Sequence, residues 1–193
     1  MIIGVAGFYC AGKDSVSNFL LRNGFDHVSL SDLIREDLRK YDKDKEITRD
    51  LLIEHGNFLR NKFGPFILSQ FAMHKIKSDS RSKCVITSIR NPAEVEFLKK
   101  NNDFVLVWVE AKPETRLLRI ISRDRENDPK TLKELLAKEK IEMSSNETSQ
   151  QLHLVRKQAN IVVNNNGSIK ELEIALTFAL EKHFGQQVIS LEF

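Results

Sequence analysis

The stretch GFYCAGKDS at residues 7–15 decides which fold this chain is expected to adopt. It follows an apolar run at residues 1–6 and precedes an apolar stripe made by Val16, Phe19 and Leu20. Glycines in such a loop let several backbone N–H groups point at one anion, and the following helix N-terminus adds partial positive charge. A strand, a glycine-rich loop ending in Gly-Lys and a helix together predict a phosphate-binding loop. The alternative is a tight strand-to-helix turn with an incidental lysine.

This loop supplies most of the expected ATP contacts. Lys13 would reach the β- and γ-phosphates and is a predicted catalytic residue. A hydroxyl side chain usually follows this lysine and holds Mg²⁺, but here Asp14 comes first and Ser15 second. We therefore assign Asp14 and Ser15 to the Mg²⁺ that accompanies ATP. An acid facing away from the site at the helix N-terminus is the alternative for Asp14. The ATP-binding residues expected in the loop are Gly7, Cys10, Ala11, Gly12, Lys13, Asp14 and Ser15.

Beyond the loop, short β-branched runs alternate with longer helical patterns. The runs at residues 1–6, 85–89, 104–109 and 161–163 predict buried strands, and a weaker run predicts one at residues 27–30. Near-continuous apolar strands separated by helices are typical of a parallel sheet covered on both faces. The pattern predicts an α/β, three-layer P-loop NTPase fold with a mostly parallel five-stranded sheet.

One domain over residues 1–193 accommodates these elements, because no repeat, low-complexity tract or linker interrupts them. Helix starts are marked at NPAE, residues 91–94, and at SIKE, residues 168–171, by a capping residue three positions before a glutamate. We expect acceptor-binding helices at about residues 31–80 and a lid at about residues 119–145.

The composition limits the partners of this chain. Lys+Arg of 30 against Asp+Glu of 27 leaves a net charge of +3, too small a surplus to indicate nucleic acid. No apolar run in the sequence is long enough to span a bilayer. Cys10 and Cys84 lie far apart and outside any metal-type spacing, so no disulfide framework is expected. We expect a cytoplasmic protein with no membrane or nucleic-acid partner.

The acceptor side is expected where two strands end, because ligands bind at the carboxyl edge of a parallel sheet. Asp32 would accept the proton of an attacking hydroxyl or organise Mg²⁺-bound water. Arg35, one turn later, and Arg90, just after the third strand, would bind an acceptor phosphate. The alternatives are a helix cap at Ser31 or Asp32, a solvated Arg35 and a packed Arg90 that supports its loop.

A cluster of arginines marks the expected lid. Arg119 and Arg123 are i,i+4 neighbours and share one helix face. An arginine on a mobile flap would neutralise the transferred phosphoryl group, and we assign this catalytic role to Arg123. A solvated basic face is the alternative. The third strand, VITS at residues 85–88, carries no acid, so Asp14 or Asp32 would have to do more of any Mg²⁺ chemistry.

Four segments together resemble the P-loop nucleoside monophosphate kinase superfamily, and dephospho-CoA-kinase-like proteins in particular: residues 7–15, 29–36, 86–98 and 161–172. The stretch NIVVNNNGSIKEL, residues 160–172, is similar to the last strand, loop and helix of dephospho-CoA kinases. In that family the loop lies beside the adenine of ATP. The resemblance implies base-side contacts from Asn165, Asn166 and Gly167.

Related families add to this likeness. SDLIR, residues 31–35, resembles the acceptor-binding segment of adenylate kinases, which place an acceptor-phosphate arginine at Arg90 and a lid arginine at Arg123. The Gly-Lys-Asp form of the loop is similar to phage-type deoxynucleoside monophosphate kinases. Through GKD at residues 12–14, SIRNPAEVE at residues 88–96 and QQ at residues 150–151, nearly the whole chain resembles the kinase-like N-terminal domain of some deoxycytidylate deaminases. The sequence has no His-x-Glu with a downstream Cys-x-x-Cys, which excludes zinc deamination.

The sequence therefore predicts a kinase that uses ATP with Mg²⁺ as cofactor. It would transfer the γ-phosphoryl group to a small nucleotide-like acceptor, either dephospho-CoA or a (deoxy)nucleoside monophosphate. A non-catalytic nucleotide sensor that acts through a protein partner is the first alternative. An ATPase or GTPase switch acting on a macromolecule is the second. The acceptor and the oligomeric state stay open.

Overall fold

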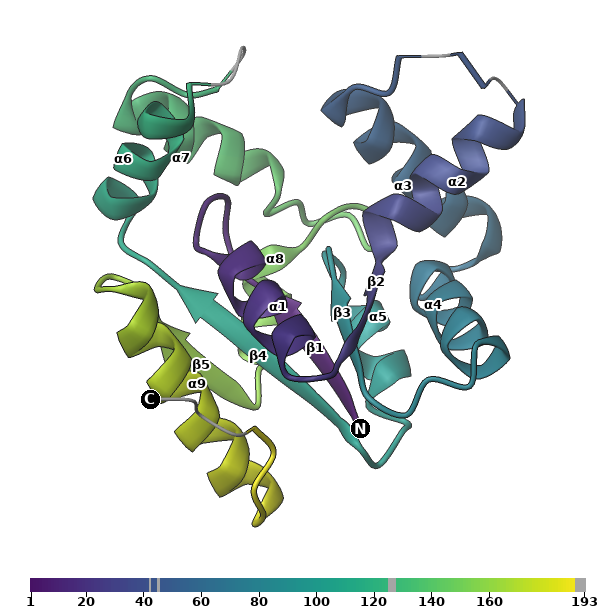
Figure 1. Cartoon of the computed structure of the whole chain (residues 1–193). Helices are drawn as coiled ribbons and strands as arrows, with labels where there is room; N and C mark the ends of the chain where they lie inside the picture. Colours follow the sequence, from purple (N-terminus) through teal and green to yellow (C-terminus); the bar gives the residue numbers. More distant parts are fainter. Residues whose placement is uncertain (42, 45, 125–127, 190–193) are drawn as a thin grey trace.

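The computed structural model describes residues 1–41, 43–44, 46–124 and 128–189, and it has three layers with a sheet in the middle (Figure 1). The five strands follow the order β2-β3-β1-β4-β5, and every ladder between them is parallel. The predicted α/β P-loop fold with a five-stranded sheet is confirmed. The strands are β1 (Ile2–Ala6), β2 (Asp26–Ser29), β3 (Cys84–Thr87), β4 (Phe104–Glu110) and β5 (Ile161–Asn164).

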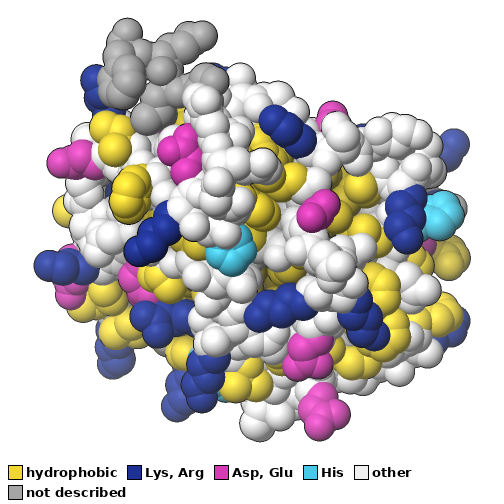
Figure 2. All heavy atoms as spheres, turned by 90° about the horizontal axis from the view of Figure 1, so that it is seen from below, with side chains coloured by type: hydrophobic (Ala, Val, Ile, Leu, Met, Phe, Trp, Pro, Cys, Tyr) yellow, Lys and Arg dark blue, Asp and Glu magenta, His cyan; other side chains and the backbone are white. Residues whose placement is uncertain are grey.

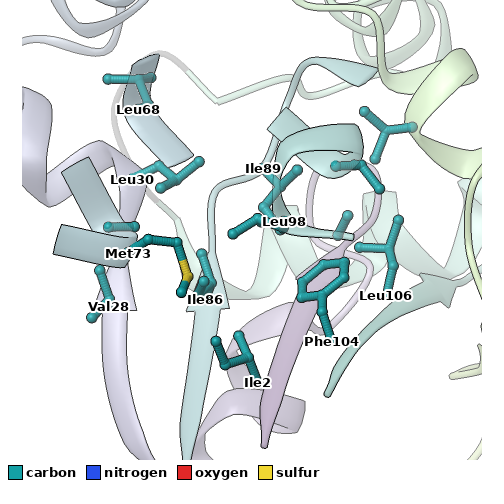
Figure 3. Close-up of a cluster of buried hydrophobic side chains, with 14 of the residues drawn as sticks. Ile2, Val28, Leu30, Leu68, Met73, Ile86, Ile89, Leu98, Phe104 and Leu106 are labelled. Atoms are coloured by element: carbon teal, nitrogen blue, oxygen red, sulfur yellow. The ribbon is translucent and has the colours of Figure 1, made fainter. Parts of the chain in front are cut away.

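Alternation along the strands divides the core into two layers. From β4, Leu106 and Trp108 pack on one face of the sheet, while Val105 and Val107 pack on the other. All five residues of β1 are buried, as expected for a central strand with both faces covered. Figure 3 shows part of the first layer, in which Phe104 and Leu106 lie near Ile89 and Leu98.

Helices cover both faces of the sheet (Figure 1). The first core layer is closed by α2 (Leu30–Tyr41), α3 (Arg49–Phe63), α4 (Ile67–Ser78), α5 (Pro92–Leu98) and α8 (Leu152–Lys157). The second layer is closed by α1 (Lys13–Arg22) and α9 (Ile169–Phe184). The two remaining helices, α6 (Pro113–Arg123) and α7 (Leu132–Ile141), pack on each other.

Helix caps form where the sequence marks them. Asn91 and Glu94 make a reciprocal capping box at the start of α5, and Ser168 and Glu171 make another at the start of α9. The 7–12 loop lies at the carboxyl edge of the sheet. In Figure 1, α6 and α7 extend beyond this edge on one side, and α2 and α3 extend beyond it on the other. The loop therefore lies between two helical regions.

The outer surface mixes charge types. In the view from below, Figure 2 shows Lys and Arg side chains scattered among acidic and apolar ones, rather than gathered in one patch. Across the described ranges, no helix combines the length and the apolar character that crossing a bilayer requires.

Candidate functional site

The phosphate loop joins β1 to α1, and close contacts explain its glycines. A Cβ on Gly7 would lie 2.5 Å from the carbonyl oxygen of Val109. Gly12 has a φ of 99°, and a Cβ there would overlap the side-chain amide of Asn165. Cys10 adopts a left-handed φ of 55°, and the Ala11 N–H donates to the Phe8 carbonyl at 3.2 Å. These turns form the tight loop that the sequence predicts.

Asn165 and Arg119 brace the end of this loop. The Asn165 side chain is buried, and its Nδ2 donates to the carbonyl of Ala11 at 2.8 Å. Arg119 donates through Nη2 to the Asn165 carbonyl at 2.8 Å and through Nη1 to the Ala11 carbonyl at 3.4 Å. The loop after β5 therefore lies against the phosphate loop. Its next residue, Asn166, accepts the N–H of Lys112 at 2.7 Å, and Gly167 is exposed.

Lys13, at the start of α1, is folded back on the loop. Its Nζ donates to the Phe8 carbonyl at 2.8 Å. Burial, with a further contribution from the nearby charge of Arg90, lowers the pKa of Lys13 to about 7, while Glu142 and Asp14 act in the opposite direction. An added phosphate would restore the ammonium form, because an opposite charge favours the ionised state.

Asp14 and Ser15 lie in the first turn of α1 and offer oxygen atoms of the kind that Mg²⁺ prefers. Asp14 is exposed and Ser15 is partly buried. No group of three or more His, Cys, Asp or Glu side chains able to hold a metal occurs in the described part of the chain. Mg²⁺ in nucleotide sites is commonly held by one or two protein groups and by the phosphates. These two residues fit that limited contribution.

A pocket of about 210 Å³ opens beside the loop, and arginines dominate its charge. One of them, Arg60, is buried and paired with buried Glu94 at 2.8 Å. Glu94 also accepts the N–H groups of Arg90 and Asn91 at 2.8 and 3.0 Å, so it fixes the turn that carries Arg90. The lining residues are Tyr9, Ser31, Ile34, Arg35, Arg49, Leu52, Ile53, Arg60, Ser88, Arg90, Glu142 and Gln150.

The structure brings Arg35 and Arg90 to this pocket, but Asp32 is not among its lining residues. The exposed Asp32 carboxylate instead accepts from Arg35 Nη1 at 2.7 Å, and Ser31 accepts from the same nitrogen at 3.2 Å. The expected role of Asp32 as a base stays a prediction.

Glu142, directly after α7, was not found by sequence reasoning. It is 3% exposed, and its carboxylate accepts hydrogen bonds from Arg49 and, at 3.2 Å, from Arg90. Burial raises the pKa of Glu142, but the positive charges of Arg90, Arg49 and Lys13 outweigh this effect and lower it below the ordinary value. Neither Glu142 nor Arg49 belongs to a local motif, and no sequence pattern singles them out.

Tyr9 connects the loop to the expected lid. The guanidinium groups of Arg49 and Arg123 both lie against its ring, at 4.3 and 4.7 Å from the ring centroid. The Tyr9 hydroxyl donates to Asp128 at 2.6 Å, and Arg123 Nε donates to the same carboxylate at 2.7 Å. Burial and the hydrogen bond to Asp128 raise the pKa of Tyr9. Arg123 is thus placed beside the phosphate loop. Residues 125–127 of the expected lid lie outside the described residues.

Two further contacts tie α6 and α7 to the loop. Arg116 of α6 donates to the Tyr9 carbonyl at 3.3 Å and to the Ala111 carbonyl at 3.0 Å. It also forms a buried ion pair with Glu139 of α7. A parallel sheet, a phosphate loop with its lysine at a helix start, and an arginine-lined pocket beside them define a P-loop kinase-like, nucleotide-binding fold.

Comparisons with known proteins agree with this class. A family model described as AAA domain (AAA_18) matches residues 3–153. A UPF0200 protein of Thermoplasma volcanium is 33% identical over 151 residues, which cover 75% of this chain and 78% of the relative. One from Staphylothermus marinus is 30% identical over 171 residues, covering 88% and 86%. The chain belongs to the AAA domain family and to the UPF0200 family.

Solved structures share the fold. TT1252 from Thermus thermophilus has a TM-score of 0.60 and 22% identity, and the match covers 94% of this chain and 97% of that one. A gluconokinase from Sinorhizobium meliloti gives 0.56 and 14%, covering 94% and 91%. Shikimate kinase from Aquifex aeolicus gives 0.52 and 17%, covering 95% and 98%. The resemblance to P-loop kinases is confirmed at the level of the fold.

Proposed function

We propose that this chain is a kinase that transfers the γ-phosphoryl group of Mg²⁺-bound ATP to a small, anionic, nucleotide-like acceptor. One observation carries the proposal: an arginine-lined pocket opens directly beside the phosphate loop. Tyr9 belongs to the loop and also lines the pocket. The charges of Arg90 and Glu142 in the pocket act on the pKa of Lys13. A γ-phosphate on Lys13 and an acceptor in the pocket would therefore be neighbours.

In this proposal the loop, Gly7 to Ser15, holds the phosphates of ATP through its backbone N–H groups and Lys13. Asp14 and Ser15 bind Mg²⁺, which neutralises the phosphates when it is bound. Asn166 and Gly167 lie on the base side. Asn165 acts chiefly through the loop, because its amide already donates to Ala11.

The acceptor occupies the pocket with its anionic group toward Arg35, Arg90 and Arg49. The apolar side chains of Ile34, Leu52 and Ile53 line the same pocket and suit the flat faces of a base. Within the described residues, the side-chain oxygen of Gln150 is buried without a hydrogen-bond partner. A buried oxygen without a hydrogen-bond donor suits a ligand that brings an N–H or O–H group.

Transfer needs charge neutralisation, and an acceptor that attacks through a hydroxyl group also needs a proton acceptor. With dephospho-CoA, a hydroxyl oxygen bonds to the γ-phosphorus as the bond to the β-bridging oxygen breaks, ADP leaves, and Asp32 takes the hydroxyl proton. With a nucleoside monophosphate, an oxygen of its phosphate attacks in the same way and no hydroxyl proton has to be removed. The Asp32–Arg35 pair at 2.7 Å must part before Asp32 takes a proton, which would also free Arg35 for the acceptor. Arg123 neutralises the charge on the moving group from its place over Tyr9.

The test is ADP release from ATP and Mg²⁺ with a panel of dephospho-CoA and the common ribo- and deoxyribonucleoside monophosphates. One acceptor should stimulate turnover, and Lys13→Ala should abolish it because the γ-phosphate loses its charged partner. Lys157→Ala makes the same substitution at an exposed position on α8 and serves as the matched control. Stimulated turnover that persists in Lys13→Ala would count against the proposal.

A second candidate is a nucleotide sensor that does not transfer phosphate. It is favoured by the exposed Asp14 in place of a hydroxyl and by a third strand, Cys84–Thr87, without an acid. Tight ATP binding with no stimulation by any acceptor in the same panel would select this function.

A further inference from the structure

Glu142 is the only carboxylate among the residues that line the arginine pocket in the described part of the chain. Its two oxygen atoms accept from two different arginines, one from α3 and one from the turn after β3. The side chain is 4% exposed, so water contributes little to its solvation. The carboxylate therefore satisfies both arginines from inside the pocket.

The segment that carries Glu142 is attached at both ends and in its middle, where Asn91 Nδ2 donates to the carbonyls of Glu147 and Ser149 at 2.6 and 2.9 Å. The carbonyl of Glu142 accepts the N–H of Leu152 at 3.0 Å, and Met143 bridges Gln151. The N–H of Gln151 donates to the carbonyl of Arg90 at 2.8 Å. The segment that carries the carboxylate is thus attached to the same turn that carries one of its arginines.

An anionic acceptor creates a conflict at this point. A phosphate on Arg49 and Arg90 would add two negative charges next to the Glu142 carboxylate, in a site with little water. Like charges that approach in a desolvated site repel strongly. Arg49 and Arg90 can pair with either anion. If the phosphate and the carboxylate were both present, the buried carboxylate would lose the positively charged partners that it needs.

We propose that Glu142 occupies the place of the acceptor's phosphate, and that a phosphomonoester displaces its carboxylate from Arg49 and Arg90 on binding. This inference rests on the proposed function, since it names the acceptor class of the same pocket. Displacement releases the Glu142 end of the 142–151 segment, which connects α7 to α8, while Asn91 still holds its middle. Acceptor binding therefore loosens the attachment of the lid to the Arg90 turn.

A fixed supporting role for Glu142 makes the opposite prediction. If the carboxylate stays in place and holds the two arginines in position, its loss weakens anion binding. If it competes with the anion, its loss strengthens binding. The sign of the change in affinity separates the two roles.

The experiment is isothermal titration of wild type and Glu142→Gln with adenosine 5′-monophosphate and with inorganic phosphate, in the presence of ADP. Glutamine keeps the size of the side chain and removes its charge. We expect about tenfold tighter binding of both probes, within the usual range of coupling between sites. The matched control is Glu147→Gln, in the same 142–151 segment, where an exposed glutamate lies outside the pocket lining. Its probe affinity should stay within about twofold of wild type.

Amide hydrogen exchange on wild type gives a second readout that needs no variant. Adding either probe should speed exchange at Gln151 and Leu152, whose N–H groups hold the 142–151 segment. Slower exchange there, or equal or weaker probe binding by Glu142→Gln, overturns the displacement and leaves the kinase proposal standing. Failure of both probes to bind either protein overturns displacement and the anionic acceptor together. Tighter binding without any acceptor-dependent ADP release overturns only the kinase.

Discussion

Replacing Lys13 with methionine should stabilise the protein while removing nucleotide binding. The ammonium group of Lys13 is desolvated, and burial lowers its pKa from the ordinary 10.5 to about 7. Each pKa unit corresponds to about 1.4 kcal/mol, so the penalty for the buried charge has an upper limit of about 5 kcal/mol. The lost hydrogen bond to the Phe8 carbonyl and imperfect repacking reduce this value. We expect the free energy of unfolding to rise by about 1–3 kcal/mol at pH 6.

The pH dependence follows from the sign of the shift. Because the folded-state pKa of Lys13 is depressed to about 7, the unfolded chain binds the proton more tightly. The penalty is complete below pH 7, where both states are protonated, and it declines as the pH rises toward the unfolded value. Between pH 6 and pH 9 the penalty should fall by up to about 2.7 kcal/mol, so urea denaturation should show most or all of the advantage of Lys13→Met disappearing by pH 9.

The control for this experiment is Lys157→Met, which makes the same change at an exposed position on α8. It should leave the free energy of unfolding within about 0.5 kcal/mol of wild type at every pH, as for most surface substitutions. A Lys13→Met variant that is no more stable than wild type, or whose advantage does not change with pH, would refute a desolvated ammonium at this site.

Two further substitutions probe the supports of the site. Glu94→Ala should lower the free energy of unfolding by about 3–5 kcal/mol in chemical denaturation, because it leaves buried Arg60 uncompensated and releases the Arg90 turn; a loss below 1 kcal/mol would contradict the buried pair. Gly12→Ala should weaken ATP binding at least about tenfold by calorimetry, since a φ of 99° strains alanine and its Cβ overlaps Asn165; unchanged affinity would contradict the observed loop.

The strands were predictable because their apolar runs are local and continuous. The structure places them within two residues of the expected bounds, and the largest difference has a backbone cause. The third strand was expected at residues 85–89 but ends at Thr87. Ser88 has a φ of 64°, in the left-handed region, which a strand does not adopt. Ile89 is nevertheless buried in the core. The apolar pattern predicts burial, and it could not distinguish a buried residue in a strand from a buried residue just after one.

The charged residues of the site were predictable only where a motif or a resemblance marked them. Lys13 follows from the loop, and Arg90 from its place between a strand and a capped helix. Arg49 and Glu142 form an ion pair across 93 positions of sequence, and no periodicity or cap reports such a contact. Asp32 was chosen because it lies just after a strand end. The side chain of a residue at the start of α2 can, however, point out of the pocket as easily as into it.

The arrangement of charges suggests different modes of binding for the two ligands. Most site arginines already have an acidic partner: Arg35 with Asp32, Arg60 with Glu94, Arg90 and Arg49 with Glu142, Arg116 with Glu139, and Arg123 with Asp128. Lys13 differs, because its described hydrogen bond goes to a neutral carbonyl and its pKa is lowered to about 7. A nucleotide phosphate therefore adds a counter-charge that the loop lacks, which favours binding at the lysine without the loss of an existing ion pair. An acceptor phosphate instead has to exchange with a carboxylate, so the net gain is the difference between two similar interactions. In the proposed function, the phosphate loop therefore supplies affinity for the nucleotide, and the arginine pocket discriminates among anions by how well they replace the internal carboxylate.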